Sequence, residues 1–428
     1  MIHLINQKGK NILFLSNILE FYKINQRTSS IILDIKSGLT RNQILERYAL
    51  LDNEYDRIIE LLKRDLKSAT VAKETHHLKK LILNVSNSCN LNCKYCYANG
   101  GVYNSAEKLM NFNTAKTAID KFISYFGEIQ QIQFFGGEPL LNYELISQCC
   151  EYIIQEQKNG RIHYIPIFGI VTNGTVINEK IINIIKKYNI NITISCDGPK
   201  KINDLLRVDL NGNGTYDTIS NTIRILYHEN NIIPNIEVTY TQYHRNQGLN
   251  VSQLLSFFKD NFGIHNIHIV PVNIDNELAI DNYADFLESI TYENIKNHDT
   301  IHKVKNIVYN LCNNCGDYKV CGAGTNVFCV NVKGDVYPCF MMNDIEGLRV
   351  TNIFNDKEHF MADIKTCQDK YDFNQKLRSP CKECFNKLLC NGCMGINVLQ
   401  NGNPLHFVDK ECEFLRALTE KTLIELAR

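Results

Sequence analysis

Tryptophan is absent from the sequence and proline is scarce, with 8 residues in 428, but these two shortages show nothing about function. Neither charge is in excess, because Lys+Arg and Asp+Glu both total 46. A nucleic-acid-binding protein would show a basic excess, so no nucleic-acid partner is expected. No apolar run approaches the roughly 20 residues that cross a membrane, and the N-terminus MIHLINQKGK lacks the apolar core of a secretory signal. We therefore expect a cytoplasmic protein without a membrane partner.

Cysteine, in contrast, is abundant, with 17 residues. Six of them precede residue 300 and eleven follow it. Without a secretory signal, so many thiols argue against a disulfide scaffold and favour metal binding in a reducing compartment. At 428 residues the chain is also too long for one ordinary domain, so two or three are expected.

The most informative motif is a set of three cysteines in the run SNSCNLNCKYCYANGG: Cys89, Cys93 and Cys96. Their Cys-x3-Cys-x2-Cys spacing follows an apolar run, Leu81–Val85, that is typical of a buried strand. A loop after a strand can turn three thiolates toward one point. Structural zinc sites usually take four ligands and a redox pair takes two, so neither explains three cysteines. Three thiolates leave one iron of a 4Fe–4S cluster open to a substrate or cofactor.

On this motif the chain resembles the radical S-adenosylmethionine (SAM) enzymes, and further motifs follow in that family's order. Gly136-Gly137-Glu138-Pro139 comes after the strand-like run QIQFF. In the family this segment binds the amino group of SAM, which the resemblance assigns to Gly137 and Glu138. Paired glycines permit close backbone approach to a ligand, although a tight turn would also use them. Tyr95, inside the cysteine loop, is implied to pack near the adenine. Thr172-Asn173-Gly174 resembles a turn at another strand end of the fold.

Two later residues are implied to hold the rest of SAM. Ser195 ends an apolar run, and Arg207 follows it in the block ISCDG…LLRVDLNGNGTYD. The resemblance implies that they contact the ribose and the carboxylate of SAM, and a guanidinium fork suits a carboxylate. The alternative for Arg207 is a surface ion pair with Asp204 or Asp209.

The C-terminal part carries a second metal signature. Cys321, Gly334 and Cys339 read Cys-x12-Gly-x4-Cys, and two close cysteine pairs follow. Two such pairs alone would suit a four-cysteine zinc site. After a radical SAM core, this many cysteines instead resemble the SPASM extension, which holds two auxiliary 4Fe–4S clusters. That resemblance assigns Cys315, Cys321, Cys339 and Cys393 to the first auxiliary cluster, and Cys381, Cys384, Cys390 and Cys412 to the second.

One spacing departs from the family pattern. Cys390 and Cys393 are separated by two residues, where the family usually has three. The assignment of Cys393 is therefore left open, and Cys312 or Cys329 could replace a ligand of the first auxiliary cluster. In total, the resemblance implies three 4Fe–4S clusters and SAM, and no catalytic residue is assigned.

Residues 1–70 form a unit without cysteine. Short strands are expected at Ile2–Ile5, Ile12–Ser16 and Phe21–Ile24. Two helices follow, one capped by Thr40 and one with a single apolar face of Ile58, Ile59, Leu62 and Leu66. This order resembles the winged-helix-like elements that hold leader peptides of ribosomally made natural products. The alternative is a helical cap on the catalytic domain.

The middle of the chain alternates strands with helices. Strands are predicted at Leu81–Val85, Gln131–Phe135, Ile165–Thr172, Ile192–Ser195, Ile236–Thr241 and Ile267–Val272, with helices such as Thr114–Phe126 and Glu179–Tyr188 between them. This alternation predicts an α/β fold with a parallel sheet, and the resemblance implies a partial (β/α)6 barrel with its site at the strand carboxyl ends. The predicted domains are 1–70 for peptide recognition, 78–305 for the barrel and 308–428 for the SPASM extension, with Val71–Lys80 as a connector.

The resemblance also implies a reaction. A reduced cluster splits SAM to give a 5′-deoxyadenosyl radical, which removes a hydrogen from a residue of a bound peptide. A cysteine of that peptide then bonds to the carbon, giving a thioether, and an auxiliary cluster accepts the electron. We therefore predict a peptide maturase, an oxidoreductase that acts on a precursor peptide with its leader and takes electrons from a partner such as flavodoxin or ferredoxin.

Three alternatives remain. A carbon–carbon cross-linking maturase would have the same motifs, because the peptide and the pocket decide the bond. An anaerobic sulfatase-maturating enzyme shares the core and the tail, but that family holds an Asp base directly after the Gly-x4-Cys cysteine, where this chain has Phe340. A non-catalytic iron–sulfur carrier would have no use for the SAM residues Glu138, Ser195 and Arg207.

Overall fold

The computed structural model describes residues 1–7, 9–67, 70–71, 77–103, 105–273, 276–317, 319–371 and 379–427. Within these residues, the largest sheet has the strand order β10-β9-β8-β7-β6-β5-β12-β13-β14. Its parallel core consists of β5 (Lys80–Ser86), β6 (Gln131–Gly136), β7 (Ile167–Thr172), β8 (Asn191–Ser195), β9 (Asn235–Tyr240) and β10 (Ile267–Pro271). Each strand runs parallel to its neighbour, so their carboxyl ends meet at one edge. The predicted α/β class and its six parallel strands are confirmed.

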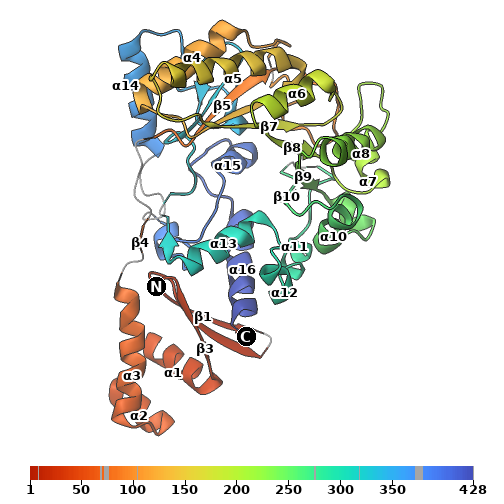
Figure 1. Ribbon diagram of the computed structural model, residues 1–428. Helices are drawn as coiled ribbons and strands as arrows, with labels where there is room; N and C mark the ends of the chain where they lie inside the picture. The colour runs from red at the N-terminus through yellow and green to blue at the C-terminus, as the bar shows by residue number, and fades with distance from the viewer. Residues whose placement is uncertain are drawn as a thin grey trace.

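Helices between the strands cover the outer face of this sheet (Figure 1). They are α4 (Phe112–Phe126), α5 (Tyr143–Lys158), α6 (Glu179–Lys187), α7 (Lys200–Leu206), α8 (Tyr216–Arg224), α9 (Gln242–Asn246) and α10 (Val251–Phe262). Successive strand residues point to opposite faces. Ile132 and Phe134 of β6 are fully buried in the same core as Phe122 of α4. Gln131 and Gln133, which alternate with them, are only half-buried, so the inner wall of the barrel is more polar than the outer face.

The cysteine-rich part extends the same sheet. β12 (Val327–Val330) runs parallel to β5, and β13 (Asp335–Tyr337) and β14 (Thr351–Asn352) continue antiparallel. The helices of this part are α11 (Ala284–Glu288), α12 (Tyr292–Lys296), α13 (His302–Cys312), α14 (Lys357–Tyr371), α15 (Met394–Asn401) and α16 (Asp409–Leu426). The gap between the predicted domains 78–305 and 308–428 falls inside α13, because the helix runs without a break across it.

The N-terminal unit has the predicted three strands, β1 (Ile2–Gln7), β2 (Lys10–Leu15) and β3 (Glu20–Ile24), in an antiparallel sheet. Its helices are α1 (Gln26–Lys36), which was not predicted from the sequence, α2 (Arg41–Tyr48) and α3 (Asp52–Lys63). Thr40 caps α2 as predicted, since its hydroxyl accepts the Gln43 backbone N–H. The expected burial of Leu66 is wrong: α3 ends before it, and Leu66 is 83% exposed.

This unit is packed against the C-terminal helix. Figure 1 shows β1 beside α16, far from the helices that cover the barrel. Lys10 donates to the carbonyl of Ile424, at 2.8 Å, and the His3 ring stacks on Phe385 with centroids 3.6 Å apart. A short pairing of β4 (Thr70–Val71) with β11 (Cys315–Gly316) adds a second link. Residues 72–76 of the predicted connector lie outside the described residues.

No helix in the described ranges is long and apolar enough to cross a membrane.

Candidate active site at the carboxyl edge of the sheet

The three motif cysteines lie on the loop that follows β5. Cys89, Cys93 and Cys96 are all half-buried, and the Cys96 backbone N–H donates to the Cys93 carbonyl at 3.1 Å, which forms a tight turn. The Cys93 and Cys96 thiols are close enough to Cys89 to act on its ionisation. Burial raises the pKa of the Cys89 thiol to about 12. The loop thus gathers three thiols whose ionisation a bound cation would favour.

The GGEP segment is held directly against this loop. The Gly137 N–H donates to the Ser86 carbonyl and the Glu138 N–H to the Ser88 carbonyl, both at 2.8 Å. A Cβ on Gly137 would stand 2.4 Å from the Ser88 oxygen, so only glycine permits this approach. The predicted neighbourhood of Gly137, Glu138 and the cysteines is therefore present in the structure.

Glu138 is fully buried, with an exposed fraction of 0%. Its carboxylate accepts hydrogen bonds from the Leu140 N–H at 2.9 Å, the Thr172 hydroxyl at 2.7 Å and the Asn173 N–H at 2.7 Å. Burial raises the pKa of this carboxyl, and the three hydrogen bonds oppose that rise. Glu138 thus ties the end of β6 to the end of β7. Its contact with the SAM amino group stays a prediction.

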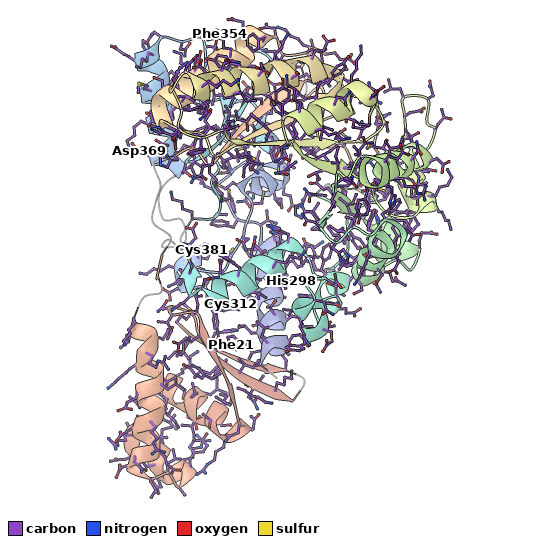
Figure 2. The ribbon with its side chains drawn as sticks, viewed as in Figure 1. Phe21, His298, Cys312, Phe354, Asp369 and Cys381 are labelled. Carbon is purple, nitrogen blue, oxygen red and sulfur yellow. The ribbon has the colours of Figure 1, made fainter. Side chains whose placement is uncertain are left out.

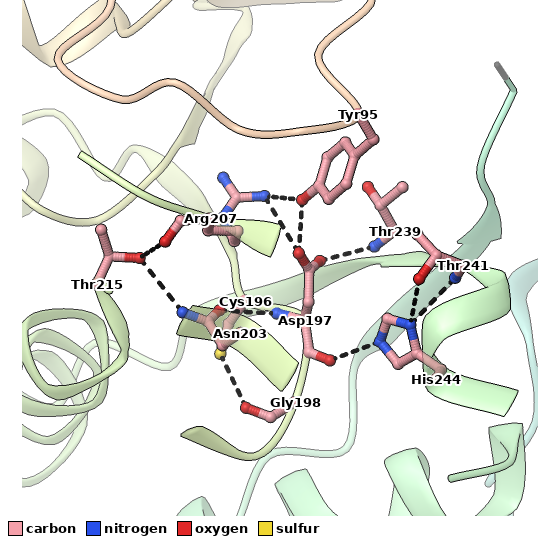
Figure 3. Close-up of polar contacts among 10 residues, drawn as sticks. All are labelled: Tyr95, Cys196, Asp197, Gly198, Asn203, Arg207, Thr215, Thr239, Thr241 and His244. Carbon is pink, nitrogen blue, oxygen red and sulfur yellow. Dashed lines mark hydrogen bonds and ion pairs between the residues drawn. The ribbon is translucent and has the colours of Figure 1, made fainter. Parts of the chain in front are cut away.

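Arg207 lies at the end of α7 beside the cysteine loop, and its contacts are drawn in Figure 3. Its Nη1 donates to the Tyr95 hydroxyl, which donates in turn to Asp197 at 2.6 Å. The same Nη1 is 3.9 Å from Asp197 Oδ2. Arg207 is only 7% exposed, so the alternative of a surface ion pair with Asp204 or Asp209 is excluded.

One donor of the Arg207 guanidinium, Nε–H, is unsatisfied within the described residues. This N–H is buried and makes no hydrogen bond to any part of the chain that the structure describes. An unpaired buried donor on a cation is costly, about 1–3 kcal/mol or more. The Cys93 thiol is among its electrostatic neighbours, so this donor lies near the cysteine loop. A bound anion such as the SAM carboxylate would satisfy it.

Asp197 was not identified from the sequence, although it stands in the quoted block ISCDG. It is fully buried and accepts the Thr239 N–H at 3.0 Å in addition to the Tyr95 hydroxyl. His244 fixes its backbone, because Nε2 donates to the Asp197 carbonyl at 2.8 Å while Nδ1 accepts the Thr241 N–H at 3.1 Å (Figure 3). Burial lowers the pKa of His244, which favours this neutral form. No sequence signal distinguishes His244 among the twelve histidines.

Ser195 and Tyr95 complete the predicted SAM residues. Ser195 is half-buried at the carboxyl end of β8, where it pairs in register with Glu237 of β9. Tyr95 packs with the apolar side chains of Ile202 and Leu206. Both residues therefore lie at the edge where the cysteines and GGEP meet, and their contacts with SAM stay predictions.

A separate cavity lies in the C-terminal part. Its walls include Pro380, Phe407 and five cysteines, namely Cys381, Cys384, Cys390, Cys393 and Cys412. Burial, together with the nearby thiols of Cys390, Cys381 and Cys384, raises the pKa of the Cys412 thiol to about 11. The structure thus brings the four cysteines predicted for the second auxiliary cluster around one cavity, together with Cys393.

The first auxiliary set is partly assembled. Cys339 has Cys393 and Cys321 as electrostatic neighbours, which places three of the four predicted ligands together. The fourth predicted ligand, Cys315, lies half-buried in the short strand β11. Cys329 is fully buried in an apolar cluster, and Cys312 is exposed at the end of α13. Figure 2 places Cys312 and Cys381 between the barrel and the N-terminal sheet.

None of the described cysteine, histidine or acidic side chains form a group of three that could hold a single metal ion. A single ion needs every ligand within about 2.3 Å of one point. A 4Fe–4S cluster instead takes each thiolate on a different iron, so its ligands are spaced more widely.

Comparison with known proteins decides the family. Residues 83–241 match the radical SAM superfamily. An uncharacterized protein of Methanocaldococcus jannaschii is 34% identical over 285 residues, which cover 65% of this chain and 90% of that protein. The chain belongs to the radical SAM superfamily. This radical SAM enzyme is also 26% identical to the radical SAM cyclopropyl synthase TigE of Paramaledivibacter caminithermalis, over 89% of this chain and 82% of TigE.

Solved structures confirm the fold of the radical SAM enzyme. Native anSMEcpe with bound AdoMet superposes with a TM-score of 0.65 and 20% identity, covering 82% of this chain and 99% of that one. SuiB of Streptococcus suis bound to S-adenosylmethionine gives a TM-score of 0.52 and 16% identity, covering 96% and 98%. The predicted partial barrel with its C-terminal extension is confirmed, and family membership implies SAM and one 4Fe–4S cluster as cofactors.

Proposed function

We propose that this radical SAM enzyme removes a hydrogen atom from a residue of a ribosomally made precursor peptide and closes a new covalent bond there. The observation that supports the cofactor site is the buried Nε–H of Arg207 beside the cysteine loop, which finds no acceptor among the described residues. The peptide substrate is supported by the structural neighbours, since SuiB has been solved with its precursor peptide SuiA and anSMEcpe with the Cp18Cys peptide. The N-terminal unit supports it independently.

In this proposal each residue has a defined task. Cys89, Cys93 and Cys96 hold a 4Fe–4S cluster, which with SAM supplies the hydrogen-abstracting chemistry of the superfamily. Arg207 binds the SAM carboxylate through its Nε–H, for which the described residues supply no acceptor. Asp197 balances the charge of Arg207 and orients its guanidinium through the Tyr95 hydroxyl. The GGEP turn is assigned to bind the amino group of SAM, and the carboxyl end of β8 is assigned to bind its ribose.

The C-terminal cysteines are proposed to hold two auxiliary 4Fe–4S clusters. The cavity lined by Cys381, Cys384, Cys390 and Cys412 supports the second, and the grouping of Cys321, Cys339 and Cys393 supports the first. Cys315 is retained as the fourth ligand of the first. Anaerobically reconstituted protein should then contain about twelve irons per chain, and zinc at these cysteines would contradict the assignment.

The N-terminal unit is proposed to bind the leader peptide as an added strand beside β3, whose residue Phe21 is labelled in Figure 2. Among the described strands, β3 pairs only with β2, so its other edge is available to a peptide. Strand addition draws affinity from main-chain hydrogen bonds and specificity from side chains at the edge. Arg64, just after α3, reaches this edge and bonds the Tyr22 hydroxyl and Glu20, both at 2.7 Å.

A point variant tests the leader site better than a deletion. Removing the unit would uncover Phe385, on which His3 and Phe14 pack and which directly follows Cys384. Arg64→Glu should instead weaken leader binding and leave peptide-free SAM cleavage unchanged. Arg47→Glu, which removes the ion pair between Arg47 of α2 and Asp34 of α1, is the matched control. Equal leader affinity for both variants would contradict the recognition role.

The bond formed is proposed to be a thioether, and a carbon–carbon closure is the second candidate. The carbon–carbon closure is kept as a candidate because this chain is similar to TigE over 89% of its length. A formylglycine-forming reaction is less well supported, because Phe340 stands where the sulfatase-maturating family holds its base. Its ring packs on Phe135 with centroids 4.5 Å apart, inside an apolar cluster.

One experiment tests the reaction and the bond together. The reconstituted enzyme is incubated with SAM, dithionite and each peptide encoded by a short reading frame beside its gene. A product two hydrogens lighter, together with 5′-deoxyadenosine, supports a ring or cross-link. Iodoacetamide then separates the candidates, since a thioether consumes one substrate thiol and a carbon–carbon bond consumes none. If every peptide keeps its mass while SAM is cleaved, the peptide substrate is refuted.

A further inference from the structure

Asn173 contacts the cysteine loop from the neighbouring strand. It follows β7 directly, is only 5% exposed, and its backbone N–H is one of the donors to Glu138. Its side-chain Nδ2 lies 3.8 Å from the Cys89 sulfur. This sulfur also accepts the Leu91 backbone N–H at 3.4 Å. Cys89 is therefore a thiol with two N–H donors directed at it.

The orientation of the Asn173 amide is determined by its other partners. The Thr175 backbone N–H, which can only donate, reaches Oδ1 at 2.9 Å, and the Thr175 hydroxyl reaches the same oxygen at 2.7 Å. The nitrogen therefore faces Cys89 and also donates to Asn90 Oδ1 at 2.9 Å. Asn90 closes the ring by donating to the Thr175 hydroxyl at 2.8 Å. The network holds the donor in place.

We propose that Asn173 is a positioning residue that donates an N–H···S hydrogen bond to the Cys89 thiolate and raises the reduction potential of the cluster bound there. The proposal rests on the cluster site proposed above. Hydrogen bonds to the sulfurs are among the factors that set iron–sulfur potentials. Since reduction adds negative charge to the cluster, a donor stabilises the reduced form more than the oxidised form.

Burial argues that Asn173 acts on the cysteine and not on SAM. At 5% exposure its amide offers little surface to a ligand, and both its oxygen and its nitrogen are engaged within the protein. Arg207, in contrast, has a buried Nε–H for which the described residues supply no acceptor. Loss of the Asn173 amide should therefore move the cluster potential and leave SAM affinity nearly unchanged.

The test uses the full-length, iron-replete protein without SAM, titrated with redox dyes and followed by EPR. Asn173→Leu keeps the approximate shape and removes the donor. This substitution should shift the reduction equilibrium of the cluster at Cys89, Cys93 and Cys96 toward the oxidised form by up to tenfold. A tenfold shift is about 59 mV for one electron. Asn173→Asp should shift it further, because it adds a negative charge. Thr175→Ser keeps both bonds to Oδ1 and should leave the potential in place.

The outcomes separate this inference from the proposed function. Native protein without a cluster at Cys89, Cys93 and Cys96 would refute the site itself. An iron-replete Asn173→Leu protein with the native potential would refute only the hydrogen bond. If the variants fail to load iron, native protein with 15N-labelled asparagine side chains gives a second measurement by pulsed EPR. A weak 15N coupling to the reduced cluster is expected, and its absence would overturn the proposal.

Discussion

Replacing Arg207 separates its two tasks, the binding of SAM and the compensation of a buried acid. Arg207→Lys keeps the positive charge but loses the fork and the free Nε–H. A hydrogen bond to a charged group is worth about 1.5–3 kcal/mol. Since each 1.36 kcal/mol is a factor of ten, SAM affinity should fall by about tenfold to about 150-fold.

Arg207→Ala should have a second effect on folding stability. Asp197 has an exposed fraction of 0% and lies 3.9 Å from the guanidinium, so the alanine variant leaves a buried carboxylate without its cation. Breaking a buried pair from one side costs about 3–5 kcal/mol. The Tyr95 hydroxyl and the Thr239 N–H still bond Asp197, so the loss should lie near about 3 kcal/mol.

A double variant provides the control. Arg207→Ala with Asp197→Asn removes both charges, and it should recover much of the lost stability without recovering SAM affinity. Anaerobic calorimetry measures SAM binding, and urea unfolding measures stability. The reasoning is refuted if Arg207→Lys binds SAM as tightly as the native protein, or if the double variant is no more stable than Arg207→Ala.

Changing Cys89, Cys93 and Cys96 together to Ala should remove four of about twelve irons and all SAM cleavage, and iron analysis with EPR would show whether the other clusters remain. Glu138→Gln should weaken SAM binding by about tenfold or more if the carboxylate meets the amino group, and calorimetry would show no change if it only supports the turn. His244 contributes stability that is full above the unfolded histidine pKa of about 6.5 and is lost as pH falls below it, because burial lowers its folded pKa. The free energy of unfolding in urea should therefore fall more between about pH 7.5 and about pH 5.5 for the native protein than for His244→Gln.

The sequence predicts local features well and tertiary ones less well. Strand positions followed from apolar runs, and β5 extends only one residue beyond the expected Leu81–Val85 at each end. The helix α1 was missed, because Ser29 and Ser30 interrupt its apolar pattern, although Asn25 caps it. Leu66 matched the face of α3 by spacing, but the helix ends before it.

The candidate site shows the same division. Cysteine spacing and GGEP indicated one cofactor site, and the structure brings both to one edge. His244 and Asn173 could not be ranked from the sequence, because their importance depends on atoms far away in the chain. The domain boundary near residue 306 was placed by family pattern, but α13 runs through it and β12 joins the barrel sheet. Pairing between distant strands leaves no local signal.

The two buried acids of the site serve its geometry and not proton transfer. Every carboxylate oxygen of Glu138 and Asp197 accepts a hydrogen bond from a fixed donor, and neither side chain is exposed. Glu138 joins the ends of β6 and β7, and Asp197, just after β8, accepts from Thr239 of β9. A proton taken by either acid would displace one of these donors and loosen two strand ends. The buried charge is therefore tolerated because it holds the edge of the sheet in the shape that the cysteine loop and Arg207 require.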